Sequence, residues 1–197
     1  MKSYIVAISG ASGSIYGIRL LEELLNQSEN IHLCISAQAF SILKTETGID
    51  WSANTPSSIE KKIQKHYAAK NIYYHSNDNL AAPVASGSFL AGVMFVVPCS
   101  MKTLAGIASG YATNLIERAA DVTLKEGRKL ILSPREMPFS AIHLGNMLKL
   151  SRMGAVIAPP VPAFYQKPKN INDIIDFVVG KILDSAGISH DLFKRWQ

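Results

Sequence analysis

The chain has 197 residues, of which 48% are hydrophobic and 18% charged, and this composition excludes a disordered chain and fits one domain spanning residues 1–197. No apolar run approaches the roughly 18 residues that a membrane helix needs, and the first residues lack the long apolar stretch of a secretory signal, so we expect a soluble, cytoplasmic protein without a membrane span. The formal net charge of +5 comes from scattered cations rather than from one basic run or helix face, which disfavours a nucleic-acid partner.

Apolar strand-like runs alternate with helical patterns along most of the chain. The predicted strands are residues 4–9, 31–36, 92–98, 129–133 and 155–158. The predicted helices are residues 15–26, 37–47, 57–66, 101–109, 115–126, 140–152 and 171–186. Residues 67–91 show no clear pattern and are assigned no element. This alternation predicts an α/β fold with a doubly wound, mostly parallel sheet, Rossmann-like or flavodoxin-like, in three α/β/α layers.

The turn after the first strand is a candidate ligand site, because ligands of such sheets bind beyond the carboxyl ends of the strands. Residues 10–14, "GASGS", let a ligand approach the backbone and offer amides at a helix start, where the helix dipole favours phosphate. The turn lacks the full G-x-G-x-x-G pattern, and the second strand ends in Ser36 rather than an acidic residue. A nicotinamide dinucleotide is therefore disfavoured, and the alternatives are another phosphate-bearing ligand or a tight turn without a ligand.

A second candidate follows the strand at residues 92–98. The phrase "PCSMKT" supplies the hydroxyl groups of Ser100 and Thr103 and the ammonium group of Lys102 near a helix start. These groups predict either an anion cradle or an ordinary helix cap.

The phrase "SPREMP", residues 133–138, places an anion binder beside a proton carrier. Neighbouring side chains of an extended chain point to opposite sides, so Arg135 and Glu136 need not neutralise each other. Pro138 disfavours the helical conformation for Met137 and helps keep the phrase extended. The phrase is therefore either a charged turn or a strand end that places Arg135 as an anion binder and Glu136 as a proton carrier in a site.

Two more cations share a helix face. Arg118 and Lys125 are seven positions apart in a predicted helix, so they lie two turns apart on the same side. They either bind an anion or form a solvated face with ion pairs to Glu117 or Glu126.

The loop "PPVPAFYQKP", residues 159–168, is stiffened by four prolines around Phe164 and Tyr165. Such a loop can fix a phenol over a pocket at low entropic cost, and its alternative role is a hydrophobic lid.

The histidines and cysteines predict neither a metal site nor a histidine-based catalytic site. Cys34 and Cys99 lie in or at the end of apolar runs, where buried and reduced thiols are expected. Ser12 and Ser100 lack a companion His and Asp in a recognisable arrangement. No shared metal-binding spacing relates the five histidines, which are His32, His66, His75, His143 and His190.

Four stretches together resemble the flavin prenyltransferase family, the UbiX-like proteins formerly described as aromatic-acid or polyprenyl-hydroxybenzoate decarboxylases. The resemblance extends from Tyr4 to about Ile188. The stretches are "SGASGSIYGIRLLEEL", "ASGSF", "VPCSMKTLAGIASGYATNLIERAADVTLKEGRKLILSPREMPFSAIHL" and "PPVPAFYQKP". The resemblance implies a protein that binds FMN and joins a dimethylallyl group from dimethylallyl monophosphate to N5 and C6 of the reduced flavin. The product, prenylated FMN, would serve a UbiD-type decarboxylase in ubiquinone biosynthesis or aromatic-acid decarboxylation.

The same resemblance implies roles for individual residues. The catalytic positions would be Glu136, Ser12 and Glu46. The prenyl phosphate would be bound by Tyr165 and Lys181, with Arg118 and Lys125 nearby. FMN would be held by Gly10, Ala11, Ser12, Ser36, Ser100, Met101, Lys102, Thr103 and Arg135. The family also implies a homo-oligomer, usually a dodecamer, with sites between subunits.

The residue types suit a prenyl transfer without a metal. Lysine, arginine and tyrosine donors on a departing phosphate can replace the metal that other prenyl-transferring enzymes use. Ring closure at C6 of the flavin requires a base, for which Glu136 is the candidate.

Three positions depart from the family pattern. Lys181 stands where some members have arginine, so it should bind phosphate with less bidentate character. Gly145 stands where the family usually has glutamate, which lowers helix propensity. Leu80 stands where some members carry an aromatic residue near the prenyl group, which bears on the preference for the allyl chain.

Two other functions are alternatives. The first is a flavin-dependent decarboxylase acting directly on an acid, as in the related phosphopantothenoylcysteine decarboxylases, which use a catalytic histidine and an asparagine-rich flavin motif where this chain has "PCSMKT". The second is an FMN carrier or electron-transfer protein. Such carriers tend to be acidic, whereas this chain has a surplus of cations at its predicted strand ends.

Overall fold

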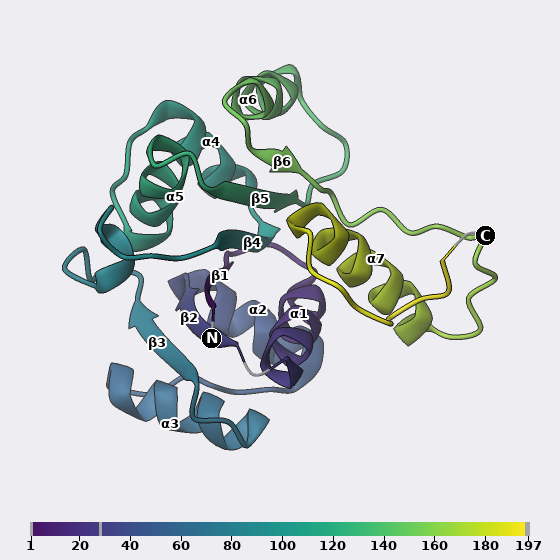
Figure 1. Cartoon of the computed structure of the whole chain (residues 1–197), viewed down its shortest axis with the longest axis horizontal. Coiled ribbons are helices and arrows are strands. Elements are labelled where there is room, and N and C mark those ends of the chain that lie inside the picture. The colour runs from purple at the N-terminus through teal and green to yellow at the C-terminus, as the bar shows by residue number, and fades with distance from the viewer. Residues whose placement is uncertain (1, 28, 196–197) are drawn as a thin grey trace.

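The structure, a computed structural model, describes residues 2–27 and 29–195 (Figure 1). The strands in these residues are β1 (Ser3–Ile8), β2 (Asn30–Ile35), β3 (Ile72–Ser76), β4 (Val93–Cys99), β5 (Lys129–Pro134) and β6 (Val156–Ile157). The helices are α1 (Ser14–Asn26), α2 (Ala37–Thr47), α3 (Pro56–Tyr67), α4 (Met101–Ser109), α5 (Leu115–Lys125), α6 (Ala141–Arg152) and α7 (Ile171–Ala186), with a short 3-10 helix η1 (Pro83–Ala85). Among these elements, no helix is long and apolar enough to cross a membrane.

The strands form one sheet in the order β3-β2-β1-β4-β5-β6, and every strand pairing is parallel. This confirms the doubly wound α/β fold predicted from the alternation of strands and helices. The direction of winding reverses between β1 and β4, the two central strands. In open sheets of this kind the ligand crevice lies at that reversal, outside the carboxyl ends of the strands.

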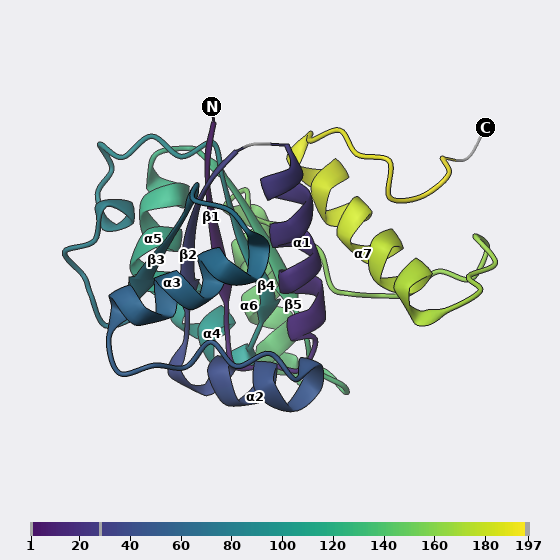
Figure 2. The same ribbon diagram turned by 90° about the horizontal axis from the view of Figure 1, so that it is seen from below.

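The two faces of the sheet bury alternate residues of each strand. In β1, Tyr4, Val6 and Ile8 pack on one face, and Ile5 and Ala7 pack on the other. The first face is covered by α1, α2, α3 and α7, and the second by α4, α5 and α6. Figure 2 views the sheet edge-on, with α1 and α7 on one side and α5 on the other. The resulting three layers agree with the prediction.

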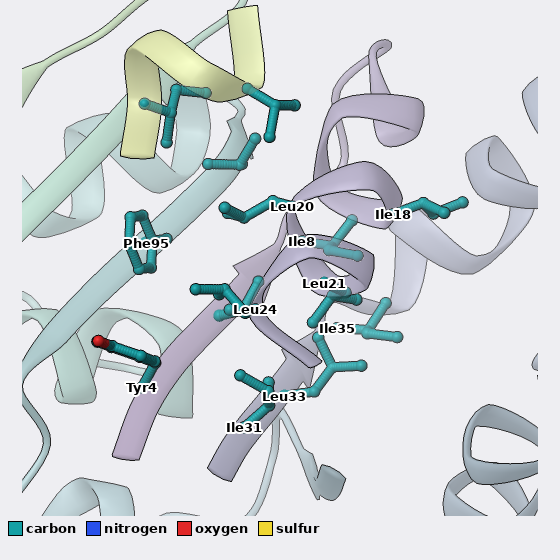
Figure 3. Packing of buried hydrophobic residues seen from close by; sticks show 14 of the residues in the cluster. Tyr4, Ile8, Ile18, Leu20, Leu21, Leu24, Ile31, Leu33, Ile35 and Phe95 are labelled. Carbon is teal, nitrogen blue, oxygen red and sulfur yellow. The ribbon is translucent and has the colours of Figure 1, made fainter. Parts of the chain in front are cut away.

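Helix α1 packs closely on the centre of the sheet. Its leucines Leu20, Leu21 and Leu24 are fully buried and point toward β1 and β4 (Figure 3). A side chain at Gly17 would come within 2.5 Å of the carbonyl oxygen of Val97, so glycine at this position permits the close approach. The N-terminus of α1 is thereby held directly beyond the carboxyl end of β1.

The strand β3 is absent from the sequence prediction, which assigned no element to residues 67–91. It is an edge strand that pairs only with β2. Its Tyr73 is 40% exposed, and it lacks the long apolar run that marks the central strands. The sheet therefore has a sixth carboxyl end, followed by Asn77.

The structure confirms the prediction that both cysteines are buried free thiols. Cys34 and Cys99 are free and buried. Burial raises the pKa of both thiols, that of Cys34 to about 12, so they stay protonated at neutral pH.

Candidate active site

Two adjoining cavities lie at the carboxyl ends of the strands. The smaller cavity has a volume of about 300 Å³ and the larger about 590 Å³. They share the lining residues Gln38, Asn77, Lys102 and Asn114. The smaller cavity is also lined by seven residues that follow strands or begin helices: Gly10, Ser36, Ser100, Met101, Thr103, Glu117 and Glu136. The structure therefore gathers most of the residues expected to hold FMN into one place.

The turn between β1 and α1 is held from two sides. Gly13 adopts a left-handed conformation with a φ of 102°, which favours glycine. The carboxylate of Glu46 accepts hydrogen bonds from the backbone amides of Gly13 at 3.0 Å and Ser14 at 2.9 Å. From the other side, Nε of Arg135 donates to the carbonyl oxygen of Ser12 at 3.2 Å. Glu46 supplies a negative charge at the N-terminus of α1, where the helix dipole favours it, and so helps to fix the turn.

Gly10 and Ser36 form a close-packed wall of the smaller cavity. A side chain at Gly10 would come within 2.9 Å of Cβ of Gln38, so only glycine fits without displacing a neighbour. The hydroxyl oxygens of Ser36 and Ser14 are buried and make no hydrogen bond in the structure. Buried hydroxyl groups are normally paired, and Ser36 lines the smaller cavity, so its hydroxyl fits a ligand with polar atoms, such as the ribityl phosphate of FMN.

The start of α4 combines a helix cap with a cavity wall. The hydroxyl oxygen of Ser100 accepts a hydrogen bond from the amide of Thr103 at 3.3 Å and donates to the Thr103 hydroxyl at 3.0 Å. The buried Ser9 links β1 to β4, because its hydroxyl oxygen accepts from the amide of Ser100 at 2.8 Å and donates to the carbonyl oxygen of Pro98 at 2.9 Å. Lys102 is exposed and lines both cavities. Sequence reasoning predicted this cap as one alternative and missed Ser9.

Arg135 and Glu136 point to different parts of the site. Arg135 contacts the β1–α1 turn, and Glu136 lines the smaller cavity. The amide of Arg135 donates to the carbonyl oxygen of Cys99 at 3.1 Å, which continues the pairing of β5 with β4 past the end of the strand. The two side chains therefore lie in different parts of the site, and their roles stay predictions.

Sequence reasoning missed the residues that link β3 to α5. Oδ1 of Asn77 accepts a hydrogen bond from the amide of Ile116 at 3.1 Å, and the backbone carbonyl oxygen of Asn77 accepts one from the amide of Leu115 at 2.7 Å. Asn114 caps α5 through the amide of Glu117 at 3.1 Å. Recognising β3 as a strand would have identified Asn77 as a strand-end candidate.

Glu117 is a buried carboxylate in the wall of the smaller cavity. It is only 4% exposed. Its Oε2 accepts hydrogen bonds from the amide and the hydroxyl of Thr113, both at 2.9 Å. These contacts make Glu117 a structural support for the turn that precedes α5.

The alternative of ion pairs to Glu117 or Glu126 is confirmed for Glu126. Lys125 pairs with Glu126. Arg118 pairs with Asp121 at 2.8 Å. Glu117 lies in the wall of the smaller cavity, where the preceding turn holds its side chain.

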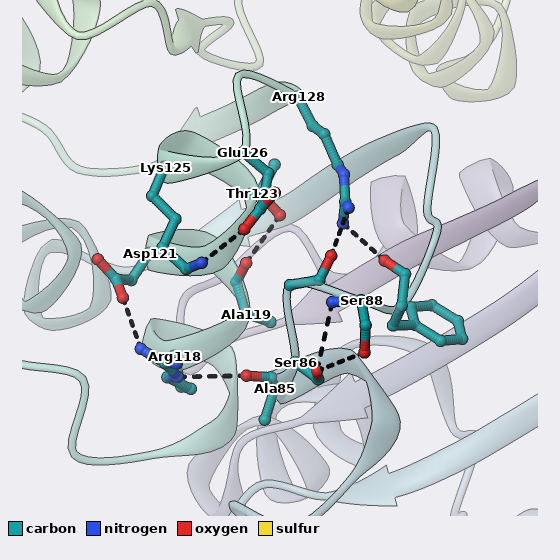
Figure 4. Close-up of polar contacts among 12 residues, drawn as sticks. Ala85, Ser86, Ser88, Arg118, Ala119, Asp121, Thr123, Lys125, Glu126 and Arg128 are labelled. Carbon is teal, nitrogen blue, oxygen red and sulfur yellow. Dashed lines mark hydrogen bonds and ion pairs between the residues drawn. The ribbon is translucent and has the colours of Figure 1, made fainter.

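Arg118 and Lys125 do share a helix face, and that face lies along residues 85–89 (Figure 4). Nε of Arg118 donates to the carbonyl oxygen of Ala85 at 3.3 Å. Arg128 fastens the same segment by donating to the carbonyl oxygens of Gly87 at 2.7 Å and Phe89 at 2.6 Å. Neither Arg118 nor Lys125 lines the two cavities.

Tyr165 and Lys181 lie at α7, away from the two cavities. The ring of Tyr165 packs edge-on against Phe177 with centroids 5.7 Å apart. The ammonium nitrogen of Lys181 is 3.6 Å from Oδ2 of Asp184. Figures 1 and 2 place α7 and α5 on opposite sides of the sheet. One chain therefore does not bring Tyr165 and Lys181 together with Arg118 and Lys125.

Neither histidines nor metal ligands take part in the site as described. None of the five histidines lines either cavity. Among the described residues there is no group of three or more His, Cys, Asp and Glu side chains that could hold a metal ion. Glu46 does not line a cavity either, since its carboxylate is turned to the amides of the β1–α1 turn.

Comparison with known proteins agrees with this geometry. A sequence model of the Flavoprotein family matches residues 1–183. The flavin prenyltransferase UbiX of Methanocaldococcus jannaschii is 55% identical over 192 residues, which cover 98% of this chain and 97% of the relative. The crystal structure of AnUbiX (PadA1) in complex with FMN and dimethylallyl pyrophosphate has a TM-score of 0.89 and 46% identity, covering 100% of this chain and 97% of that one. A dodecameric FMN-dependent UbiX-like decarboxylase from Escherichia coli O157:H7 has a TM-score of 0.88 and 44% identity, covering 99% of both chains.

Proposed function

The chain belongs to the flavin prenyltransferase family, and on this premise we propose how it joins a dimethylallyl group from dimethylallyl monophosphate to N5 and C6 of reduced FMN. The observation that carries the proposal is the buried, unpaired hydroxyl of Ser36 beside Gly10, in a cavity at the carboxyl edge of the sheet. Bound there, reduced FMN supplies the electron-rich ring positions to which the prenyl group is joined.

The residues around the smaller cavity hold the flavin. The hydroxyl of Ser36 gains a hydrogen-bond partner when a polar ligand enters, so binding removes an existing cost of burial. Lys102 and Arg135 contribute positive charge toward the flavin phosphate. The backbone of residues 10–12 and the start of α4, residues 100–103, complete the cradle.

The phosphate of the allylic donor is bound by cations and a phenol. As the bond between the prenyl carbon and the phosphate oxygen breaks, negative charge grows on the phosphate, and fixed donors stabilise that charge. Tyr165 and Lys181 supply donors from α7 and the loop before it, and Arg118 and Lys125 supply them from α5. These two groups lie on opposite sides of one chain, so a complete phosphate site needs residues from more than one subunit.

A homo-oligomer is consistent with the surface of α6. Only Leu150 is buried among the twelve residues of this helix. Apolar side chains are exposed there and in the neighbouring segments: Met137, Ile142, Leu144, Leu148 and Met153. Such a surface is suited to burial against other copies of the chain. We propose a dodecamer, the assembly of the similar protein from Escherichia coli.

Glu136 is the proton acceptor of the proposed reaction. It lines the smaller cavity from the end of β5, together with Ser36 and residues 100–103. The bond to C6, a carbon–carbon bond, would form as the prenyl double bond is consumed and gains a proton, and Glu136 would take the proton that leaves C6. Ser12 lies on the neighbouring turn, and Glu46 positions that turn through the amides of Gly13 and Ser14.

The product is proposed to pass to a UbiD-type decarboxylase in the cytoplasm. The alternative of direct decarboxylation relied on a catalytic histidine, and none of the five histidines faces the cavities. The alternative of an FMN carrier leaves the cations near Tyr165 and on α5 without a ligand. Prenyl transfer uses both groups of cations, which supports it over the two alternatives.

The test is a mass measurement on the flavin. The purified protein is incubated with reduced FMN and dimethylallyl monophosphate under anaerobic conditions, and the flavin is then analysed by mass spectrometry. We expect a gain of one C5 unit, with oxidised FMN and omission of the protein as controls. A parallel sample with the diphosphate distinguishes the donors. Unchanged flavin mass with both donors would contradict the proposed function.

A further inference from the structure

A network of side chains surrounds Asp184 on α7 and includes Lys181. Oδ1 of Asp184 is 2.8 Å from a terminal guanidinium nitrogen of Arg195 and 3.2 Å from Nε2 of His190. Oδ2 is 3.3 Å from the other terminal nitrogen of Arg195 and 3.6 Å from the ammonium nitrogen of Lys181. Two cations that are fourteen residues apart in the sequence therefore share one carboxylate.

The inner side of this network is rigid and the outer side is exposed. The side chain of His190 is fully buried, and its Nδ1 accepts a hydrogen bond from the amide of Leu192 at 3.2 Å. The ring therefore carries its proton on Nε2 and donates it to Asp184, which fixes the carboxylate. Lys181 and Arg195 are each 57% exposed, compared with 22% for Asp184. A ligand from solvent would therefore meet the two cations before the carboxylate.

The segment after α7 turns back along the helix and meets the loop that carries Tyr165 (Figures 1 and 2). Phe177 of α7 packs against Tyr165 at 5.7 Å and against Phe193 at 5.1 Å, measured between ring centroids. The side-chain amide of Gln166 donates to the carbonyl oxygen of Lys194 at 3.0 Å. Tyr165, Lys181 and Arg195 thus belong to three segments that are packed into one unit.

Two carboxylates and two cations meet in this unit. Asp184 faces both Lys181 and Arg195, and the charge of Asp191 also acts on Arg195. Partial burial acts to raise the pKa of Asp184, but the hydrogen bond from Arg195 and the charges of its neighbours together lower it, so the carboxylate stays ionised at neutral pH. The ammonium group of Lys181 and the guanidinium group of Arg195 are both exposed, and they are the kind of donors that bind an anionic phosphate.

The geometry of Arg195 also suits a phosphate. Its guanidinium lies 5.9 Å from the centre of the Phe193 ring, a cation–π distance that restrains its plane. A guanidinium has five N–H donors in a planar fork, and Asp184 takes two of them. The other donors can bind phosphate oxygens in the bidentate manner that a lysine cannot provide.

We propose that Arg195 is a further binding residue for the phosphate of the allylic donor and acts with Lys181, both cations being held on Asp184 until the donor binds. The inference rests on the proposed function, because that function places the donor phosphate at Tyr165 and Lys181. On binding, the phosphate takes over the donors of both cations that Asp184 holds in the donor-free protein.

The experiment compares single variants of the full-length, FMN-loaded protein. Arg195→Gln should raise the KM for dimethylallyl monophosphate about 10- to 100-fold, the range expected for losing charge-assisted hydrogen bonds, with an unchanged dissociation constant for FMN. Lys194→Gln is the matched control, because it removes the same charge from the adjacent exposed position and should leave KM unchanged. Equal effects of Arg195→Gln and Lys194→Gln, or an unchanged KM in Arg195→Gln, would overturn the proposal.

A third variant tests whether Arg195 binds the donor phosphate or only holds the segment after α7 in place. Asp184→Asn breaks the ion pairs but leaves an oxygen that can accept from His190. If Arg195 binds the donor, this variant keeps or improves donor affinity, since a negative charge is removed. Loss of donor affinity equal to that of Arg195→Gln would mean that Arg195 only fastens the chain, and the proposal would be wrong.

Equilibrium binding of dimethylallyl monophosphate by calorimetry repeats these comparisons without turnover. A protein that binds the donor through Arg195 but prenylates no flavin would contradict the proposed function alone. A protein that prenylates FMN with unaltered donor binding in Arg195→Gln would contradict this inference alone.

Discussion

Arg135 and Ser12, which are 123 positions apart in the sequence, meet at the carboxyl edge of the sheet, where Nε of Arg135 donates to the carbonyl oxygen of Ser12 at 3.2 Å. The contact joins the end of β5 to the turn that follows β1. The contact holds the guanidinium of Arg135 at the turn that is proposed to bind FMN. The carboxylate of Glu46, from α2, contacts the same turn through the amide of Gly13. The turn is thus fixed by one cation and one anion before any ligand binds.

We expect Arg135→Gln to weaken FMN binding about 10- to 100-fold, because a charge-assisted contact to the flavin phosphate is lost. Arg135→Lys should lose less affinity, since it keeps the charge but not the fork of donors. The dissociation constant is measured by titrating FMN and following its fluorescence. Arg152→Gln, on the exposed end of α6, is the control for charge alone. Equal FMN affinity in Arg135→Gln and the control would remove Arg135 from the flavin site.

Ser36→Ala should change stability and ligand binding in opposite directions. The buried hydroxyl of Ser36 has no hydrogen-bond partner in the structure, so its removal should leave the FMN-free protein unchanged or more stable by about 1 kcal/mol. FMN affinity should fall, because a contact formed only with the ligand is lost. Urea unfolding without FMN and fluorescence titration with FMN measure the two effects.

Ser133→Ala is the matched control for Ser36→Ala. The hydroxyl of Ser133 is also buried and unpaired, but Ser133 lines neither cavity. It should therefore change stability without changing FMN affinity. If both variants bind FMN as tightly as the unchanged protein, the unpaired hydroxyl of Ser36 is not a mark of the flavin site.

Glu136→Gln and Glu46→Gln should separate chemistry from binding. In the proposed reaction Glu136 accepts a proton, so Glu136→Gln should bind FMN normally and turn over about 100- to 10,000-fold more slowly. Glu46→Gln removes the negative charge at the N-terminus of α1 and should weaken both the turn and FMN binding. Turnover is followed by the mass of the flavin over time. Normal turnover in Glu136→Gln would exclude Glu136 from the proton transfer.

The strand ends could be predicted from the sequence because each of them follows a strongly apolar run. The runs that end before Gly10, Ser100 and Arg135 belong to β1, β4 and β5, which are buried on both faces. In a parallel sheet the carboxyl ends of such strands meet at one edge, so local patterns were enough to gather these residues.

The rest of the site depends on contacts that local patterns do not reveal. The edge strand β3 is half exposed, so its sequence "IYYHS" has no long apolar run, and Asn77 after it could not be recognised. The amide side chain of Asn77 contacts α5 at Ile116, 39 positions away. Glu117 is one of two acidic residues that the sequence offers as ion-pair partners of the cationic helix face, but the turn at Thr113 holds its carboxylate.

The paired histidines of β2 and β3 make stability depend on pH. Nδ1 of His32 lies 2.9 Å from Nε2 of His75, so one ring donates and the other accepts, and the contact needs at least one neutral ring. Burial, and next the neighbouring His75, lowers the pKa of His32 from 6.5 to about 4. Burial also lowers the pKa of His75, although Glu60 opposes this effect. The folded protein therefore binds fewer protons than the unfolded chain between about pH 6.5 and 4.

The free energy of unfolding should accordingly be constant above about pH 6.5 and fall as the pH decreases toward 4, because protons bind preferentially to the unfolded chain. Since both rings are partly exposed, we expect this pair to account for a loss of about 1–2 kcal/mol, less than full burial would give. Urea unfolding at several pH values measures it. His32→Gln should flatten the dependence, whereas His66→Gln, which changes an exposed histidine, should leave it intact. The same slope in both variants would show that carboxylates elsewhere, rather than the histidine pair, set the loss of stability, since only His32→Gln removes the contact with His75.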